Sequence, residues 1–537
     1  MTATVTAQLP PGPLGEPIRR HRPPARLVAF AAGTVLPLVF PLVLLLWHAA
    51  FGGPWRGVLP GGRLLQLGFN TVLLVVAVVG GSTVVGLATA WLTSRSDIPG
   101  RRIWATLTVL PLVVPSYVGA LALLAATGRR GMVSEMIAPL GLGPLPIPRG
   151  FGGAALALIL FTYPYIHLTL VPALRSLDPS LDEVARGLGA GRRRRFWTVT
   201  LPQIAPALRN GALLVALYTM ADFGAVSLLR YDTFTRAIFL QYAGRLDRRP
   251  ATVLATILML MAIAVVWAER KSRRRMEIAG GRLVRPQPRV TLGPWARAGG
   301  QIFLGVVCLF SIVLPVAILL RWWIRGSLAG GEAVAVWGEL GASLGVSALA
   351  AVLIVIVAVP LAVLTVRYRS RVGEVAETAA WTVYALPHIT VGLAVLLTGV
   401  SLVLPLYQTL PLLLFAYLMM FLPQALGPAQ VALRRVSPSL EEASRSLGRP
   451  PFATAMKVTV PLIGKGLLAG AGLVFLTTMK ELPATLLLRP TGFETLAVRI
   501  WSTTSEGFYT RASFAALVLV AVSAIPLHFL IIRDLHD

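Results

Sequence analysis

Three charged residues lie inside otherwise apolar stretches of the sequence: Asp222, Lys480 and Glu481. A charge near the middle of a bilayer costs ~2.5–3.5 kcal/mol on insertion scales, so such a side chain normally faces a polar interior or a charged partner. Gly224 and Pro483 closely follow the two acids and can break a helix there. Two interpretations therefore stay open. The acids line a pathway that favours a cation, or they form structural ion pairs with Lys480 or a neighbouring arginine.

A second chemical pattern occurs twice, in two polar loops of matching length. Each loop has an acid with a small residue close after it, and the glycine and the proline follow the acid at the same spacing in both loops. Each indicates a short helix opened by Pro-Ser, with acids in the first turn, where the helix dipole favours them. The glycine permits a sharp reversal, and a second amphipathic segment is predicted to end near the proline. The positions are Glu183, Ala185, Gly189 and Pro202 in the first loop, and Glu442, Ala443, Gly448 and Pro461 in the second.

The sequence lacks the motifs for ATP binding and for two common types of hydrolase. A phosphate-binding loop needs Gly, four residues, then Gly-Lys-Ser/Thr, but Gly464-Lys465 is followed by Gly466 and has no upstream glycine. No His-Glu-x-x-His or Gly-x-Ser-x-Gly pattern is present, so an intramembrane enzyme is not favoured. His167 and His388 have no second ligand at helical spacing, and we expect packing alone to account for them. No metal site is assigned, and any ATP must be hydrolysed on a separate subunit.

The elements that carry these residues are predicted to be membrane-spanning helices. Hydrophobic residues make up 56% of the 537 positions and charged residues 13%, whereas soluble proteins carry roughly 25% charged residues. A bilayer core takes about 20 apolar helical residues. Twelve stretches qualify: 27–49, 70–93, 103–127, 151–172, 207–229, 252–268, 301–324, 343–366, 376–400, 409–432, 464–488 and 512–533.

The net charge of +27 is distributed asymmetrically. Most Lys and Arg residues fall in the N-terminal tail, the two polar loops and the segment between the halves. The positive-inside rule therefore predicts that these parts, and both termini, are cytoplasmic. The basic residues are not interleaved with stacking aromatics, so nucleic acid is not an expected partner. The 269–300 segment reads as a basic linker that can also contact anionic lipid headgroups.

An internal repeat divides the chain. At a constant offset of 259, residues 173–230 match 432–489 at 26 of 58 positions. Six predicted spans precede the midpoint and six follow it, so both halves enter the membrane in the same sense. We predict an all-α membrane protein with a basic tail (1–26), a first half (27–268), the linker (269–300) and a second half (301–537). The polar loops occupy about 175–206 and 434–463.

The spacing of the two loops resembles the signature loop of permease subunits of bacterial type I ABC importers. In that family the loop forms a coupling helix that docks on a cytoplasmic ATPase. The resemblance implies that Glu183 and Glu442 contact the ATPase, and that Gly189 and Gly448 shape the elbow. Val184 and Ser444 depart from the family pattern, but both are small enough for a packed helix face. It also implies two ATPase copies carrying ATP and magnesium, an extracytoplasmic substrate-binding protein, and location in the bacterial inner membrane.

The fused form, with both halves in one chain, resembles ferric-iron importer permeases, with thiamine and phosphonate importers as near relatives. The stretches that carry this resemblance are 222–231 and 480–490. It implies ferric iron as cargo, moved by alternating access, with thiamine, a phosphonate or another small solute as alternatives. A secondary transporter is a rival of a different class, because Asp222 and Glu481 could serve ion coupling in broken helices. That rival gives the paired loops no purpose.

Overall fold

The computed structural model describes residues 23–52, 62–128, 131–141, 143–244, 248–273, 289–328, 336–368 and 370–527. These residues form helices and no strands, apart from one isolated bridge between Ser96 and Val290. Among these residues ten helices are long and apolar enough to cross a membrane, and the number rises to twelve if each of two bent helix pairs is one span. The sequence prediction of an all-α membrane protein with about twelve spans is confirmed.

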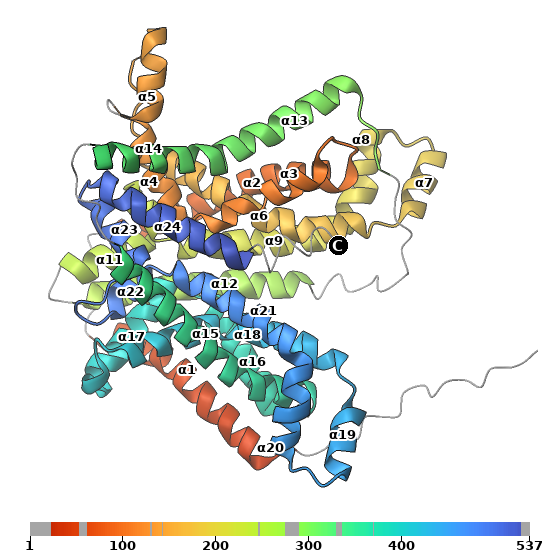
Figure 1. Cartoon of the computed structure of the whole chain (residues 1–537), viewed down its shortest axis with the longest axis vertical. Coiled ribbons are helices and arrows are strands. Elements are labelled where there is room, and N and C mark those ends of the chain that lie inside the picture. Colours follow the sequence, from red (N-terminus) through yellow and green to blue (C-terminus); the bar gives the residue numbers. More distant parts are fainter. Residues whose placement is uncertain are drawn as a thin grey trace, which may run out of the picture.

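The first half contains six spans in chain order (Figure 1). They are α1 (Ala25–Phe51), α2 (Arg63–Arg95), the bent pair α3 (Arg101–Leu107) with η1 (Leu110–Val113) and α4 (Ser116–Ala126), α6 (Phe151–Arg175), the continuous helix α8 (Arg192–Arg195), η3 (Phe196–Thr200) and α9 (Leu201–Ala221), and α12 (Arg249–Arg273). The shorter elements are α5 (Met132–Ile137), η2 (Ala138–Leu140), α7 (Pro179–Gly187), α10 (Gly224–Leu228) and α11 (Phe234–Gly244).

The second half repeats this order of six spans. They are α13 (Pro294–Cys308) continuous with η4 (Leu309–Val313) and α14 (Leu314–Leu328), α15 (Trp337–Val366), the bent pair α16 (Arg371–Tyr384) and α17 (His388–Leu402), α18 (Leu410–Arg435), α20 (Pro451–Thr454) continuous with η6 (Ala455–Thr459) and α21 (Val460–Met479), and α24 (Tyr509–Leu527). The shorter elements are η5 (Leu404–Leu406), α19 (Pro438–Ser446), α22 (Pro483–Leu488) and α23 (Leu496–Ser505).

Two predicted spans, 103–127 and 376–400, are bent rather than straight. The chain turns by 93° between the segments 101–113 and 116–126, and by 111° between α16 and α17. Pro115 and Pro387 sit directly before α4 and α17. Proline has no N–H, and it disfavours helical geometry at the residue before it, so the helix stops at each site. Hydropathy did not reveal the bends because both arms are apolar.

The predicted spans 207–229 and 464–488 also end early. α9 stops at Ala221 and α21 at Met479, and the short helices α10 and α22 follow after a break. Asp222 and Glu481 therefore lie at helix breaks and not within spans as predicted. The tail and linker predictions fall partly outside the described residues, at 1–22 and 274–288. α13 begins at Pro294, earlier than the predicted boundary.

The first span of each half packs on the other half. α1 lies against α15, α16 and α17, while α14 lies against α4 of the first half as well as α24 of its own half (Figure 1). The rest of each half forms its own helix group, seen in the close packing of α2 with α6 and of α15 with α18. This exchange binds the two halves into one body.

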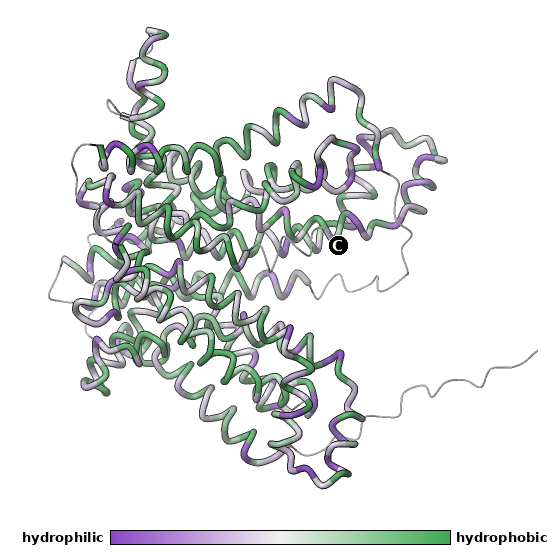
Figure 2. The backbone as a smooth tube through the Cα atoms, in the orientation of Figure 1, coloured by the Kyte–Doolittle hydropathy of each residue, from purple (hydrophilic) through white to green (hydrophobic). Residues whose placement is uncertain are grey.

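The two helix groups diverge toward the side that carries α7 and α19 and come together at the opposite side, where α11 and α23 lie (Figure 1). Figure 2 shows hydrophobic residues along the middle of the long helices and hydrophilic residues at α7 and α19. That banding fits a protein whose spans face lipid and whose loops face water.

Candidate translocation cavity and coupling helices

A cavity of about 230 Å³ opens between the two halves at the helix breaks. Both halves contribute polar side chains to its wall. The first half supplies Ser116, Tyr117, Tyr165, Tyr218 and Asp222, and the second half supplies Tyr384, His388, Gln424, Thr477, Lys480 and Glu481. All three charged residues singled out in the sequence therefore line one cavity.

Asp222 occupies the break that follows α9. Its backbone N–H donates to Tyr218 O at 2.8 Å, which closes the last turn of the helix. Its Oδ1 accepts from the N–H groups of Ala225 and Val226 at 3.1 and 3.2 Å, and its Oδ2 accepts from the Ser116 hydroxyl. The carboxylate thus caps the start of α10 and joins it to the bend of the third span.

Glu481 repeats this arrangement in the second half. Its Oε1 accepts from Ala484 N at 3.0 Å, at the start of α22, and its Oε2 lies 2.6 Å from Nδ1 of His388. His388 is the first residue of α17, just as Ser116 is the first residue of α4. The expectation that packing alone accounts for His388 is therefore wrong, since its ring pairs with a buried acid. His167 is fully buried and contacts the hydroxyls of Thr89 and Thr108.

Lys480 is not the partner of either acid. Its Nζ donates to the carbonyl of Leu112 at 2.9 Å, across the interface between the halves. The described residues show no ion pair between Lys480 and Asp222 or Glu481, and no arginine pairs with either acid. The interpretation that paired the acids with Lys480 or an arginine is thus wrong. Glu481 instead pairs with the imidazole of His388, and Asp222 accepts from the Ser116 hydroxyl.

Three aromatic rings pack together beside the cavity, on the side away from α7 and α19. Phe223 lies beside Phe239 of α11 and Trp501 of α23, with ring centroids 4.8 and 5.7 Å apart, and the last two rings are 5.1 Å apart. Phe223 itself lines the cavity. Phe223 and Phe239 belong to the first half and Trp501 to the second, so the two halves meet in this cluster, on the side where the helix groups come together (Figure 1).

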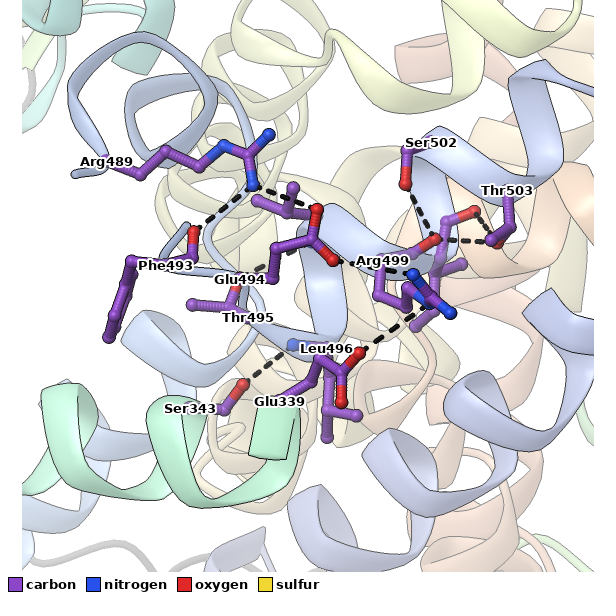
Figure 3. Close-up of polar contacts among 12 residues, drawn as sticks. Glu339, Ser343, Arg489, Phe493, Glu494, Thr495, Leu496, Arg499, Ser502 and Thr503 are labelled. Atoms are coloured by element: carbon purple, nitrogen blue, oxygen red, sulfur yellow. Dashed lines mark hydrogen bonds and ion pairs between the residues drawn. The ribbon is translucent and has the colours of Figure 1, made fainter. Parts of the chain in front are cut away.

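Ion pairs hold the segments around these rings. In the second half Arg499 of α23 reaches Glu339 at 3.7 Å and Glu494 at 3.6 Å, and Glu494 also pairs with Arg489 (Figure 3). Thr495 caps α23 by accepting from Val498 N. In the first half Asp232 plays the corresponding part, pairing with both Arg63 and Arg236.

The coupling-loop motif forms two matching helices, α7 and α19. Side chains before each helix accept from its first turn: Asp178 from Ser180 N at 2.9 Å, and Ser437 from Ser439 N at 3.4 Å. Gly189 and Gly448 follow the helices with φ of +76° and +84°, a conformation that glycine adopts without strain. The short helix and sharp reversal expected from the sequence are both present.

The helix that follows each coupling helix does not end at the proline. Residues 193–221 and 451–479 each form one span, with Pro202 and Pro461 two residues after the end of a π-helical segment. The predicted end of an amphipathic segment near these prolines is therefore wrong. A proline removes one i→i−4 hydrogen bond, and the wider π turn before it lets the helix continue through the site.

The acids of each coupling helix take two different roles. Asp182 pairs with Arg195 at 2.7 Å, and the corresponding Glu441 pairs with Arg367 at 3.0 Å, so this position anchors the helix. Glu183 and Glu442, the next residues, are exposed and make no hydrogen bond or ion pair with any described residue. Exposed apolar side chains surround them: Leu181, Val184 and Leu188 on α7, and Leu440 and Leu447 on α19. Ala185 is half-buried, and Ala443, Pro202 and Pro461 are exposed.

Comparison with known proteins adds the decisive observation. Residues 82–277 and 350–535 each match the family described as binding-protein-dependent transport system inner membrane component. The chain belongs to this family. It is a multi-pass inner-membrane permease with the family domain present twice, which agrees with the duplicated fold.

Relatives of this permease carry several names. It is 32% identical to the Fe(3+)-transport system permease protein FbpB 2 of Haemophilus influenzae, over 95% of this chain and 98% of that protein. It is 26% identical to the ferric transport system permease protein FbpB of Actinobacillus pleuropneumoniae, over 88% of this chain and 72% of that protein. A sulfate transport system permease protein, CysW of Synechocystis, is 30% identical over 43% of this chain and 86% of its own length.

The sequence analysis did not identify Ser116 as the hydrogen-bond partner of Asp222 or His388 as the partner of Glu481. Both residues directly follow a proline inside an apolar stretch, at Pro115 and Pro387. A polar residue after a proline in the third span of each half was the available signal. The distance between the two positions is 272 residues and not 259, so the ungapped repeat did not align them.

Proposed function

We propose that this permease is the membrane subunit of an ATP-driven importer of ferric iron. The observation that carries the choice of cargo is its similarity, over almost the full length of both chains, to a permease named for Fe(3+) transport. The two acids at the wall of the cavity support it, because Asp222 and Glu481 give the passage between the halves a negative potential that favours a cation.

We further propose that α7 and α19 dock on two copies of a separate ATPase subunit, which holds ATP and magnesium. Glu183 and Glu442 would make charged contacts with it, and Ala185 and Ala443 would pack at the docking surface. Gly189 and Gly448 would set the elbow, and Pro202 and Pro461 would lie within the first turns of the span that follows it. Two exposed acids without internal partners, each amid exposed leucines, support these roles.

In this proposal the coupling helices and both termini are cytoplasmic, and an extracytoplasmic substrate-binding protein docks on the opposite face. Single cysteines placed in a Cys308→Ser background test the orientation. A membrane-impermeant thiol reagent applied from outside should label Leu140→Cys and Glu506→Cys, and it should not label Leu188→Cys or Leu447→Cys, which are all exposed positions. Labelling of the last two from outside would reverse the orientation and remove the docking proposal.

Transport is tested by reconstituting the permease with its ATPase and binding protein in liposomes. Loaded binding protein and ATP should drive uptake of radioactive ferric iron, and uptake should survive ionophores that collapse ion gradients. Uptake without ATP that follows an ion gradient would instead identify a secondary transporter.

Sulfate is a second candidate cargo. Sulfate permeases match one half of the chain, and Lys480 places a positive charge at the wall of the cavity. Measuring uptake of radioactive sulfate into the same liposomes decides between ferric iron and sulfate as the cargo. ATP-driven sulfate uptake with no iron uptake would refute the ferric-iron proposal and leave the permease class intact.

A further inference from the structure

In the ring of His388, one nitrogen is hydrogen-bonded and the other has no hydrogen-bond partner among the described residues. Nδ1 lies 2.6 Å from the Glu481 carboxylate and donates to it. Nε2 has no hydrogen-bond partner among the described residues and is not one of the buried polar atoms. The imidazole is 28% exposed, whereas the Glu481 side chain behind it is 4% exposed. Phe421 meets the ring edge-to-face at a centroid distance of 5.4 Å, which helps to fix its orientation.

The carboxylate decides which nitrogen can bind a ligand. A neutral imidazole carries one proton, and the acceptor at Nδ1 keeps that proton there. Nε2 then presents its lone pair to the cavity. A carboxylate behind one ring nitrogen, with the other nitrogen free, is the arrangement by which proteins orient a histidine toward a metal ion. Imidazole nitrogen suits zinc, copper, iron and nickel ions.

We propose that Nε2 of His388 is a contact atom for a transition-metal cation in transit through the cavity, with Glu481 as the positioning residue behind it. This inference rests on the proposed function in one respect, that the cargo is a metal cation. It adds a donor atom to which the sequence analysis gave no role.

The surroundings make this a weak contact. Among the described residues no group of three or more His, Cys, Asp or Glu side chains is placed to hold a metal ion. Lys480, on the same wall, opposes the binding of a cation. Conduction requires binding that is weak enough for release. A single oriented imidazole, with water completing the coordination, meets that requirement better than a closed site.

The first half provides the contrast. Asp222 has the same place as Glu481, but the residue that faces it is Ser116, whose side chain is almost fully buried and whose hydroxyl is spent on the acid. At this position of the cavity wall the first half therefore has no imidazole nitrogen that could serve as a donor atom.

The test uses the permease assembled with its ATPase in lipid nanodiscs, with Cu²⁺ as the probe and pulsed electron paramagnetic resonance to detect imidazole nitrogen on the metal. His388→Asn keeps a donor close to Nδ1 for Glu481 and removes Nε2. We expect the His388→Asn variant to lose the signal of one imidazole-bound copper ion and to bind copper at least tenfold more weakly. Glu481→Gln should weaken binding by about 10- to 100-fold, because the amide can donate to Nδ1 and move the proton to Nε2.

His167→Gln is the matched control, because that histidine is buried outside the cavity with both nitrogens beside threonine hydroxyls. It should leave copper binding unchanged. If His388→Asn does not yield folded protein, His388→Ser takes its place, since serine is the residue that the first half uses.

Unchanged copper binding in the folded His388 variant refutes the inference, even where the wild-type complex imports iron. Loss of copper binding in that variant supports it. If the wild-type complex then fails to import iron, the ferric-iron proposal fails separately while the metal contact stands.

Discussion

The two halves of the permease share a backbone at the cavity but present different chemistry there. Tyr165 and Tyr218 of the first half pack with ring centroids 5.7 Å apart. The residues at the same repeat positions in the second half, Gln424 and Thr477, are joined by a hydrogen bond of 2.7 Å. Small Ala221 corresponds to Lys480. At these positions the first half lines the cavity with phenol rings, and the second half lines it with an amide, a hydroxyl and an ammonium.

The coupling loops differ much less. Each has the same cap position, the same left-handed glycine and an exposed acid flanked by exposed leucine. Under the proposed function, a docking surface that meets two copies of one ATPase must remain alike in both halves, whereas a cavity that holds one cargo has no such constraint. On that proposal the symmetric loops serve coupling and the asymmetric cavity wall serves cargo recognition.

The largest effect is expected from removing the symmetric acids. Glu183→Ala combined with Glu442→Ala should reduce transport by more than a hundredfold, since each charge-assisted contact is worth ~1.5–3 kcal/mol. Membrane insertion should be unaffected, because both side chains are exposed and unpaired within the chain. ATPase stimulation by loaded binding protein, measured in liposomes, checks this. The two single variants should have similar effects, and full transport by the double variant would show that these acids are not docking residues.

A smaller effect should separate the two coupling helices. Arg367, at the end of α15, donates to Glu441 and to the carbonyl of Val436, and Glu441 is 8% exposed. Arg367→Ala leaves this acid with Thr459 and the more distant Arg445, so α19 should lose ~2–3 kcal/mol of local stability, below the ~3–5 kcal/mol for a fully buried pair.

The matched variant in the first half is Arg195→Ala. Asp182 is more exposed than Glu441 and also pairs with Arg186, so the loss should be ~1 kcal/mol or less. Hydrogen exchange of residues 179–187 and 438–446 reports both values. Equal protection of the two helices in the two variants would mean that the anchors are equivalent after all.

The third prediction concerns the acids at the helix breaks. Glu481→Gln should lower iron uptake about tenfold, because it removes a negative charge and allows the proton of His388 to move from Nδ1 to Nε2. Asp222→Asn should lower it less than threefold, since the amide oxygen still caps α10 and Ser116 can rotate to accept. Uptake by the two variants at equal permease level is the measurement. A larger loss in Asp222→Asn would place the main cation contact in the first half.

Combining Glu481→Gln with Lys480→Met provides the control. Lys480 is bound to Leu112 and not to Glu481, so the second substitution should not restore the yield or the uptake of the first. Restoration would show that the two charges interact in some state other than this one.

Local signals in the sequence were sufficient for the coupling helices. Pro-Ser openings, first-turn acids and the glycine all act within about ten residues, and these three features occur where expected. The predicted segment end at Pro202 and Pro461 does not, because the helix continues through both prolines. The spans were also found correctly in number, because a bilayer imposes length and apolarity on each one.

The cavity depended on contacts that local signals do not contain. His388 and Glu481 are 93 residues apart, and Lys480 meets Leu112 at a separation of 368. The bends at Pro115 and Pro387 bring these residues together, and averaging hydropathy over a whole span conceals such bends. The acids themselves were identified, but their partners could not be.

The smallest effect is expected where the linker joins the first half. Asp97, between α2 and α3, accepts from Leu292 N at 2.9 Å and pairs with Arg297 at 2.5 Å, beside the bridge from Ser96 to Val290. The second half has no copy of this contact among the described residues. There the loop after α15 uses Arg367 to hold the coupling helix instead.

The Leu292 N–H, with Arg297 acting in the same direction, holds the pKa of the Asp97 carboxyl below its usual value. A lowered pKa in the folded state means that the contact contributes stability above the ordinary pKa and loses it as pH falls through the lowered one. We therefore expect the linker contact to be constant near neutral pH and to weaken only below about pH 4.

A spin label at Thr291→Cys, in the Cys308→Ser background, should stay immobile from pH 7 to 5 and become mobile only in the more acidic range. Asp97→Asn should give a slight increase in mobility at every pH and abolish the acidic step, because the amide still accepts from Leu292 but cannot titrate. A label that becomes mobile near pH 6, or an acidic step that persists in Asp97→Asn, would show that another group holds the linker.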